Sequence, residues 1–331
     1  MNGIKVLDCT FRDGGYVNNW EFGQENIEQI LHNLVNSKLD YIELGYLKSV
    51  EYDRNKTIFS SIEDIKKICE TYSEQEFCVM INYGDFQIED LPQNNIKNLN
   101  IRLAFKKKDI NSAIEDCYNL KNKGYKIFIN PMVTDCYADD ELIKLITEVN
   151  KIQPVALTIV DTLGEMVEEN IEKLYQIIEK NLDKNIALCF HSHNNMQKSF
   201  ANTQYLIDLC KTHNLVIDAS VFGMGRGAGN LCTELITQDI NKNYYTKYDA
   251  SKIIEIGKTY IMPIYEKKPW GCSAEYYLAA LNHCHPDYAK YLKDKQLSGE
   301  TISQILQSIP EEKKANFSLE FIIDFFKDTK M

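Results

Sequence analysis

The chain is poor in positive charge and has no apolar run long enough to cross a bilayer. Its 331 residues hold 37 lysines and arginines against 48 aspartates and glutamates, a formal net charge of -11. Proteins that bind nucleic acids usually present a basic surface, so this balance argues against a nucleic-acid partner. No apolar stretch approaches the roughly 20 residues that a membrane-spanning helix needs. We therefore expect no nucleic acid and no membrane among its partners, and small molecules as its ligands.

Paired cysteines and a targeting segment are also missing. The 10 cysteines include no Cys-x-x-Cys pair, the spacing of many zinc and redox sites. Residues 1–5 lead directly into an apolar segment without the pattern of a signal peptide. Scattered cysteines in such a chain are typical of reduced thiols in the cytosol. We expect a cytoplasmic protein.

Short apolar segments alternate with amphipathic ones over most of the chain. The strands are expected at 4–9, 41–46, 77–81, 99–105, 125–131, 155–160, 186–193 and 216–222. Helices are expected between most of them, at 24–35, 61–71, 109–123, 139–150, 167–180 and 197–212, and from 231 onward. Strands at intervals of roughly 20 to 35 residues predict βα units that close into a (β/α)₈ TIM barrel, an α/β fold. An open doubly wound sheet is the alternative. We expect residues 1–243 to form the catalytic barrel domain.

The pattern changes after Tyr244 to helices without strands. These are expected at 250–261, 274–292, 299–307 and 318–326. Residues 244–331 therefore form a helical C-terminal region in this interpretation, packed on the barrel over its mouth or at a subunit interface. The charged run at 310–314 is typical of a solvated loop or a helix start.

Two histidines one residue apart end an apolar segment. Residues 186–190 suit a strand that is buried on both faces, and His191 and His193 follow. Side chains at i and i+2 of a strand point to the same side, so both imidazoles could reach one metal ion. The alternative is one hydrogen-bonded core histidine and one solvated histidine. A second such pair, His283 and His285, falls where the sequence predicts a helix, on which i and i+2 do not face each other.

Polar residues gather at the ends of the expected strands. In a barrel these ends share the face on which active sites are built. Asp13 could supply the anionic oxygen that Mg²⁺ or Mn²⁺ prefers, although an N-cap or Asx turn is the alternative. Arg12 could stabilise a developing enolate oxygen beside that metal, or form a surface ion pair. The set comprises Arg12, Asp13, Glu43, Asp161, His191, His193 and Asn230.

Three segments carry a resemblance to a known family. They are residues 8–15 (DCTFRDGG), 191–194 (HSHN) and 223–231 (GMGRGAGNL). In this order they resemble the signatures of the metal-dependent carbon–carbon lyases and condensing enzymes built on the DRE-type TIM barrel. Within that superfamily the chain is most similar to the 4-hydroxy-2-oxovalerate aldolase branch, and the resemblance covers about residues 4–240.

The resemblance implies a divalent metal bound by Asp13, His191 and His193. Asn230 would be a fourth ligand or a group that holds one. Mn²⁺ or Mg²⁺ is the expected ion, with Co²⁺ and Zn²⁺ as alternatives. The metal would chelate a 4-hydroxy-2-oxo acid and stabilise the enolate left when the C3–C4 bond breaks, giving pyruvate and an aldehyde. Arg12 would contact the same enolate oxygen.

Further roles follow from the resemblance, and one residue departs from it. Thr162 would contact the substrate carboxylate, although the adjacent Asp161 could simply cap the next helix. Glu43 would orient Arg12 or bind substrate. Tyr16 stands where the aldolases carry a histidine base, and a tyrosine with a pKa near 10 is a poor base unless a cation lowers that pKa. Metal-bound water could take the role instead, and Tyr16 could be a packing residue. The change predicts an unusual aldehyde, for example a sugar-derived one.

Two other functions stay open. One is a Claisen-type reaction on an acyl-coenzyme A and a 2-oxo acid, as in isopropylmalate synthases and hydroxymethylglutaryl-coenzyme A lyases. The catalytic cysteine of those lyases belongs in the glycine loop, yet residues 223–230 contain none and Cys232 follows them. The other is a non-catalytic metal-binding subunit. We expect a homo-oligomer; the resembled branch often pairs with an aldehyde dehydrogenase, but the C-terminal sequence does not predict that partner.

Overall fold

A computed structural model describes residues 3–328 and shows a closed parallel barrel. Neighbouring strands follow the order β1-β9-β8-β7-β6-β5-β4-β2, and pairing of β1 with β2 closes the ring. A two-residue strand, β3 (Ile58–Phe59), adds to the edge of β2. The (β/α)₈ prediction is confirmed, and the open sheet is wrong. The barrel strands are β1 (Ile4–Asp8), β2 (Tyr41–Leu47), β4 (Glu76–Asn82), β5 (Leu99–Phe105), β6 (Lys126–Pro131), β7 (Ala156–Asp161), β8 (Ala187–Ser192) and β9 (Leu215–Ala219).

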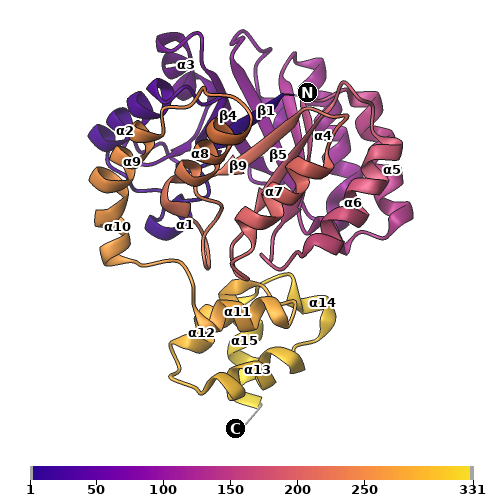
Figure 1. Ribbon diagram of the computed structural model, residues 1–331. Helices are drawn as coiled ribbons and strands as arrows, with labels where there is room; N and C mark the ends of the chain where they lie inside the picture. The colour runs from indigo at the N-terminus through magenta and orange to yellow at the C-terminus, as the bar shows by residue number, and fades with distance from the viewer. Residues whose placement is uncertain (1–2, 329–331) are drawn as a thin grey trace.

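Amphipathic helices surround this barrel (Figure 1). Most of them turn an apolar stripe toward the strands, as the four buried residues of α4 at 113, 114, 117 and 120 illustrate. Ser61 and Asp64 form a capping box that fixes the start of α3. The connection from β4 to β5 holds only a 3-10 turn, as its sequence predicted. The helices are α2 (Gln24–Asn36), α3 (Ile62–Thr71), α4 (Ile110–Asn122), α5 (Asp139–Ile152), α6 (Glu168–Asn181), α7 (Ser199–Leu209) and α8 (Thr233–Asn243).

Two sequence predictions were wrong in detail. The strand expected at 216–222 ends at Ala219, because Phe222 and Gly223 both adopt positive φ and turn the chain out of the sheet. The helix expected at 274–292 is interrupted before Pro286. His283 has a φ of 56° and separates α11 (Ala274–Leu281) from α12 (Pro286–Lys293).

The C-terminal helices fall into two groups. α9 (Ala250–Ile256), a π-helical turn (Gly257–Ile261) and α10 (Met262–Lys267) pack on the barrel, and their apolar residues belong to its core. The rest of the described chain, 274–328, builds a second core of its own. We call this unit the C-terminal cluster: α11, α12, α13 (Gly299–Ser308), α14 (Glu311–Lys314) and α15 (Leu319–Asp328).

The C-terminal cluster lies against one end of the barrel, below it in Figure 1. This is the end at which the strands finish, because the cluster shares a pocket with residues that follow β4, β5, β6 and β7. The domain boundary after residue 243 stays a prediction. Among the described residues, no helix combines the length and the apolar character needed to span a membrane.

Candidate active site

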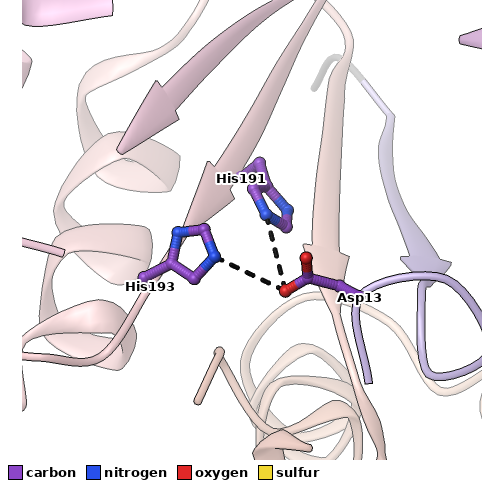
Figure 2. A group of neighbouring side chains, drawn as sticks. All are labelled: Asp13, His191 and His193. Atoms are coloured by element: carbon purple, nitrogen blue, oxygen red, sulfur yellow. Dashed lines mark ion pairs between the residues drawn. The ribbon is translucent and has the colours of Figure 1, made fainter. Parts of the chain in front are cut away.

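Three side chains from distant parts of the chain converge at this end of the barrel. Asp13 follows β1, His191 lies in β8, and His193 comes one residue after β8. The Oδ2 atom of Asp13 is 4.0 Å from Nε2 of His191 and 3.5 Å from Nε2 of His193 (Figure 2). All three are buried, and one ligand atom from each lies within 4.8 Å of the others. Within residues 3–328 no second histidine, cysteine or carboxylate group of this kind occurs.

A hydrogen bond behind His193 and a close carboxylate behind His191 decide which of their nitrogens face the centre. Nδ1 of His193 donates to the carbonyl oxygen of Asp161 at 2.9 Å, and Nδ1 of His191 lies 3.0 Å from Oδ2 of Asp218. Each Nδ1 therefore carries the proton, and each Nε2 presents a lone pair to the carboxylate of Asp13. Nε2 of His193 is buried without a hydrogen-bond partner. Lone pairs that face one another in this way fit a bound cation.

A chain of buried ion pairs supports the centre. Oδ1 of Asp13 is 2.5 Å from Nη1 of Arg12, whose Nε is 2.8 Å from Oε2 of Glu43. The same Oε2 is 3.2 Å from Nη1 of Arg102, whose Nη2 is 2.5 Å from Oδ2 of Asp218. None of these side chains is more than 5% exposed. The network contains two arginines and three carboxylates, so its net charge is minus one. A bound divalent cation would change that net charge to plus one.

The charges of this network set the protonation states. Burial acts to raise the pKa of Asp13, but the Arg12 guanidinium holds it well below its usual value. Burial also acts to raise the pKa of Asp218, and Arg102 outweighs it, so the pKa falls to about 2. Burial lowers the pKa of His191 to about 4. At neutral pH the carboxylates are ionised and this imidazole is neutral, as metal ligation requires.

Asn230 reaches the centre from the glycine-rich loop after β9. Its Nδ2 donates to Oδ2 of Asp13 at 2.7 Å and lies 3.3 Å from the carbonyl oxygen of Met224. The amide nitrogen, not the oxygen, thus faces Asp13. A Cβ on Gly225 would lie only 2.6 Å from that nitrogen, so the close wrap of the loop needs glycine there. Of the two predicted roles for Asn230, this placement fits the one that holds a ligand.

A pocket opens on the centre and contains most of the predicted site residues. Arg12, Asp13, Tyr16 and Thr162 line it together with both histidines, as do Tyr46 and Arg226. Oγ1 of Thr162 accepts a hydrogen bond from the backbone N–H of Val133 at 2.8 Å, so its own proton can be donated to another acceptor. Within the described chain Glu43 is absent from this lining.

Glu43 is the predicted substrate contact for which the geometry gives no support. It is fully buried, and its Oε2 is held between Nε of Arg12 and Nη1 of Arg102. Because Oε2 engages two guanidinium groups, the alternative prediction, that Glu43 orients Arg12, fits the structure better.

Tyr16 lies at the outer rim of this pocket and is 36% exposed. Its hydroxyl is 3.0 Å from the hydroxyl of Tyr46, and the guanidinium carbon of Arg226 lies 5.3 Å from its ring centroid. Burial raises the pKa of Tyr46 well above its ordinary value. Tyr46 therefore stays protonated at neutral pH and can donate a hydrogen bond to the oxygen of Tyr16.

Sequence reasoning missed three charged residues of the site. Arg102 and Asp218 each stand inside a mostly apolar strand, β5 and β9, and that contrast was a visible signal. Arg226 carried no such signal, because an arginine among glycines is equally typical of a solvated loop. Its place at the pocket follows from the tertiary structure alone.

Comparison with known proteins places these residues in a family context. Residues 3–259 match the family model described as HMGL-like. The 4-hydroxy-2-oxovalerate aldolase of Bacillus cereus is 21% identical over 266 residues, which cover 79% of this chain and 76% of that protein. The enzyme of the same name from Brevibacillus brevis is 22% identical over 268 residues, 79% of this chain and 77% of its own.

Solved structures agree on the fold. The N-terminal domain of a candidate aldolase from Bacteroides vulgatus is 27% identical with a TM-score of 0.77, covering 91% of this chain and 99% of that chain. The HMG-CoA lyase of Brucella melitensis is 15% identical with a TM-score of 0.62, covering 80% of this chain and 100% of its own. The second likeness concerns the fold alone.

Proposed function

The chain belongs to the HMGL-like family, and on that premise we propose that it is a metal-dependent aldolase. Its substrate would be a 4-hydroxy-2-oxo acid, cleaved to or formed from pyruvate and an aldehyde. The observation that carries the proposal is the convergence of Asp13, His191 and His193 beside the fixed guanidinium of Arg12. The aldolase names of the curated relatives support the same reaction class.

Asp13, His191 and His193 would hold the metal. One carboxylate and two neutral imidazoles suit Mn²⁺ or Mg²⁺, with Co²⁺ and Zn²⁺ as alternatives. A divalent cation held there supplies Lewis-acid stabilisation of negative charge on the oxygen of a 2-oxo acid. The single net negative charge of the buried ion-pair network favours such a cation.

Arg12 and Thr162 would bind the oxo-acid end of the substrate. Nε and Nη1 of Arg12 are engaged by Glu43 and Asp13, so the guanidinium is fixed and its Nη2 keeps its hydrogens for the substrate. A fixed donor of this kind stabilises an oxygen on which negative charge develops. The hydroxyl of Thr162 would donate to the substrate carboxylate.

Tyr16 would exchange a proton with the substrate hydroxyl, unless water does so. In cleavage the C4 hydroxyl gives up its proton, the C3–C4 electron pair moves through C3 onto the C2 oxygen beside Arg12, and the aldehyde leaves. A proton returned to C3 then gives pyruvate. The hydrogen bond that Tyr46 can donate would stabilise a transient charge on the Tyr16 oxygen.

The other functions predicted from the sequence lack a supporting observation. Burial raises the pKa of Cys232, the cysteine after the glycine loop, to about 12. Its thiol is therefore protonated at neutral pH and unsuited to catalysis of the acyl-coenzyme A type. The non-catalytic subunit, the homo-oligomer and the aldehyde dehydrogenase partner stay predictions.

The proposal is tested by proton exchange on pyruvate alone. With Mn²⁺ or Mg²⁺ the protein should exchange the methyl protons of pyruvate with solvent deuterium, which proton NMR measures. His191→Gln should lower the rate at least about 100-fold, because it removes a ligand. His283→Gln is the matched control from the other histidine pair, since His283 is 67% exposed and bonded to Glu165, and it should exchange normally. If the protein exchanges no pyruvate protons with Mn²⁺, with Mg²⁺, with Co²⁺ or with Zn²⁺, so that all four fail, the proposal is refuted.

A further inference from the structure

Arg226 lies where the active-site pocket meets a second pocket, which is formed between the barrel mouth and the C-terminal cluster. The two pockets share six residues, among them Tyr16, Thr162 and Arg226. The second, which we call the outer pocket, adds Lys106 from the end of β5 and His285 from the start of α12. Asp13, His191 and His193 line only the first. The outer pocket therefore begins beyond the space for the oxo acid.

Arg226 differs from the two arginines of the ion-pair network. Arg12 and Arg102 each bind two carboxylates, whereas no carboxylate within residues 3–328 forms an ion pair with Arg226. The guanidinium of Arg226 makes a cation–π contact with the ring of Tyr16. Its Nε is buried without a hydrogen-bond partner. A buried donor without an acceptor is unfavourable, and a bound oxyanion would satisfy it.

His285 has charged neighbours of both signs: Arg226 and Lys106 on one hand, and Oδ2 of Asp287, 3.7 Å from its Nδ1, on the other. Burial is the main reason that its pKa lies well below the ordinary value, and the charges of Arg226 and Lys106 lower it further. Nδ1 of His285 accepts a hydrogen bond from the backbone N–H of Asp287 at 3.3 Å, so Nε2 carries the proton. A neutral histidine in this state is a hydrogen-bond donor at its Nε2.

The acids of the outer pocket have cationic or donor neighbours of their own. Asp85 forms an ion pair with Lys48 at 3.0 Å. The carboxylate of Asp287 lies in the first turn of α12, where the helix dipole favours it. Asp109 and Lys108 both line the pocket, so their formal charges add to zero. Arg226 and Lys106 are thus the cations left for a ligand.

We propose that the outer pocket binds an oxyanion, a phosphate or a carboxylate, carried on the far end of the aldehyde. Arg226 is the main contact, and Lys106 and His285 add to it. This inference rests on the proposed aldolase reaction and names its substrate class, a 4-hydroxy-2-oxo acid with a second anionic group. The planar guanidinium suits such groups because it bonds two of their oxygens at once.

The test compares aldehydes that differ in the far group. Condensation with pyruvate is measured for glycolaldehyde phosphate, succinic semialdehyde and neutral glycolaldehyde. The wild type should show kcat/KM roughly 10- to 100-fold higher for an anionic aldehyde, the worth of a charge-assisted hydrogen bond. Arg226→Gln should bring the ratio of kcat/KM for an anionic aldehyde to kcat/KM for glycolaldehyde near one. Arg226→Lys should keep part of this preference. The preferred anion identifies the source as phosphate or carboxylate.

Adjacent lysines provide a matched control. Lys106→Gln should lower the same ratio by a smaller factor than Arg226→Gln. Lys107 does not line the outer pocket within the described chain and pairs with Glu141 at 2.6 Å, so Lys107→Gln should leave the ratio unchanged. Equal effects of the two lysine substitutions would contradict the assignment, because only one of these side chains lines the pocket. Circular dichroism of each variant excludes misfolding as the cause.

Calorimetry with ethyl phosphate measures the site without catalysis. The wild type should bind it, and Arg226→Gln should bind it at least about 10-fold more weakly. A wild type that uses neutral and anionic aldehydes equally, or that binds ethyl phosphate no better than the variant, overturns the inference. Failure of pyruvate exchange in the wild type would refute the aldolase proposal instead, while ethyl phosphate still decides whether an oxyanion site exists.

Discussion

Arg102 is the buried residue on which the ion-pair network depends. It is fully buried in β5, and its guanidinium contacts Glu43 from β2 and Asp218 from β9. Asp218 in turn fixes the ring of His191. The orientation of an imidazole at the centre is therefore set by an arginine that does not line the active-site pocket within the described chain.

Replacement of Arg102 should destabilise the whole protein. Arg102→Met leaves the buried carboxylate of Asp218 without its guanidinium partner and leaves Glu43 paired with Arg12 alone. We expect the free energy of unfolding to fall by about 3 to 5 kcal/mol. Urea denaturation measures it. Lys144→Met, which removes a solvent-exposed partner of Asp140, is the control and should leave stability unchanged. A similar small effect of both substitutions would show that the buried network contributes little.

The contribution of Asp218 to stability should depend on pH. Its pKa in the folded state is about 2, below the ordinary 3.8, so the ionised form stabilises the fold. That stabilisation, about 2 kcal/mol, is complete above the unfolded pKa and is lost as pH falls from about 4 toward 2. The difference in unfolding free energy between wild type and Asp218→Asn should therefore shrink between pH 6 and pH 3. If this difference in unfolding free energy stayed constant between pH 6 and pH 3, the predicted contribution of ionised Asp218 would be contradicted.

At the scale of elements, the loop between β9 and α8 contacts two predicted metal ligands, Asp13 and His193. It folds around Asn230, whose amide nitrogen bonds Asp13, and an isolated bridge ties the backbone of Asn230 to His193. Gly223, Gly225 and Gly229 allow this, because a Cβ there would meet Asn230 or the backbone of Gly223. Because the loop contacts two predicted ligands, it should influence the affinity of the site for its metal without contacting the metal itself.

Gly225→Ala tests this role of the loop. The new Cβ would lie 2.6 Å from Nδ2 of Asn230 and displace the amide that bonds Asp13. We expect the affinity for Mn²⁺, measured by calorimetry, to fall roughly 10- to 100-fold, as for other groups that position ligands. Gly299→Ala is the control, because its Cβ would meet nothing closer than 3.8 Å. Unchanged Mn²⁺ binding in Gly225→Ala would exclude the positioning role.

At the scale of the whole molecule, the C-terminal cluster has a hydrophobic core separate from those of the barrel, and residues of both units line the outer pocket. The barrel core extends through α9 and α10, and the C-terminal cluster has its own. The barrel supplies the predicted metal ligands, whereas His285 of the outer pocket comes from the C-terminal cluster. Substrate recognition at the mouth should therefore require both units.

Leu306→Ala separates the stability of the two cores. Leu306 is fully buried in the C-terminal cluster, and its truncation should cost about 2 to 5 kcal/mol of packing. Hydrogen exchange should accelerate in residues 274–328, while residues 250–267 keep the slow exchange of the barrel strands. Leu235 is 46% exposed, so Leu235→Ala should change hydrogen exchange neither in residues 274–328 nor in residues 250–267. Acceleration of 250–267 together with the cluster would instead favour the boundary after residue 243.

The sequence by itself determined the barrel and the places of Asp13, His191 and His193. Strand and helix periods depend on residues a few positions apart, and parallel strands must end on one face, so these features are readable without coordinates. Only the tertiary structure decided which buried charges pair and that Arg226 faces an outer pocket. Partners such as Arg102 and Asp218 are 116 residues apart, and closure of the barrel, not local sequence, brings them into contact.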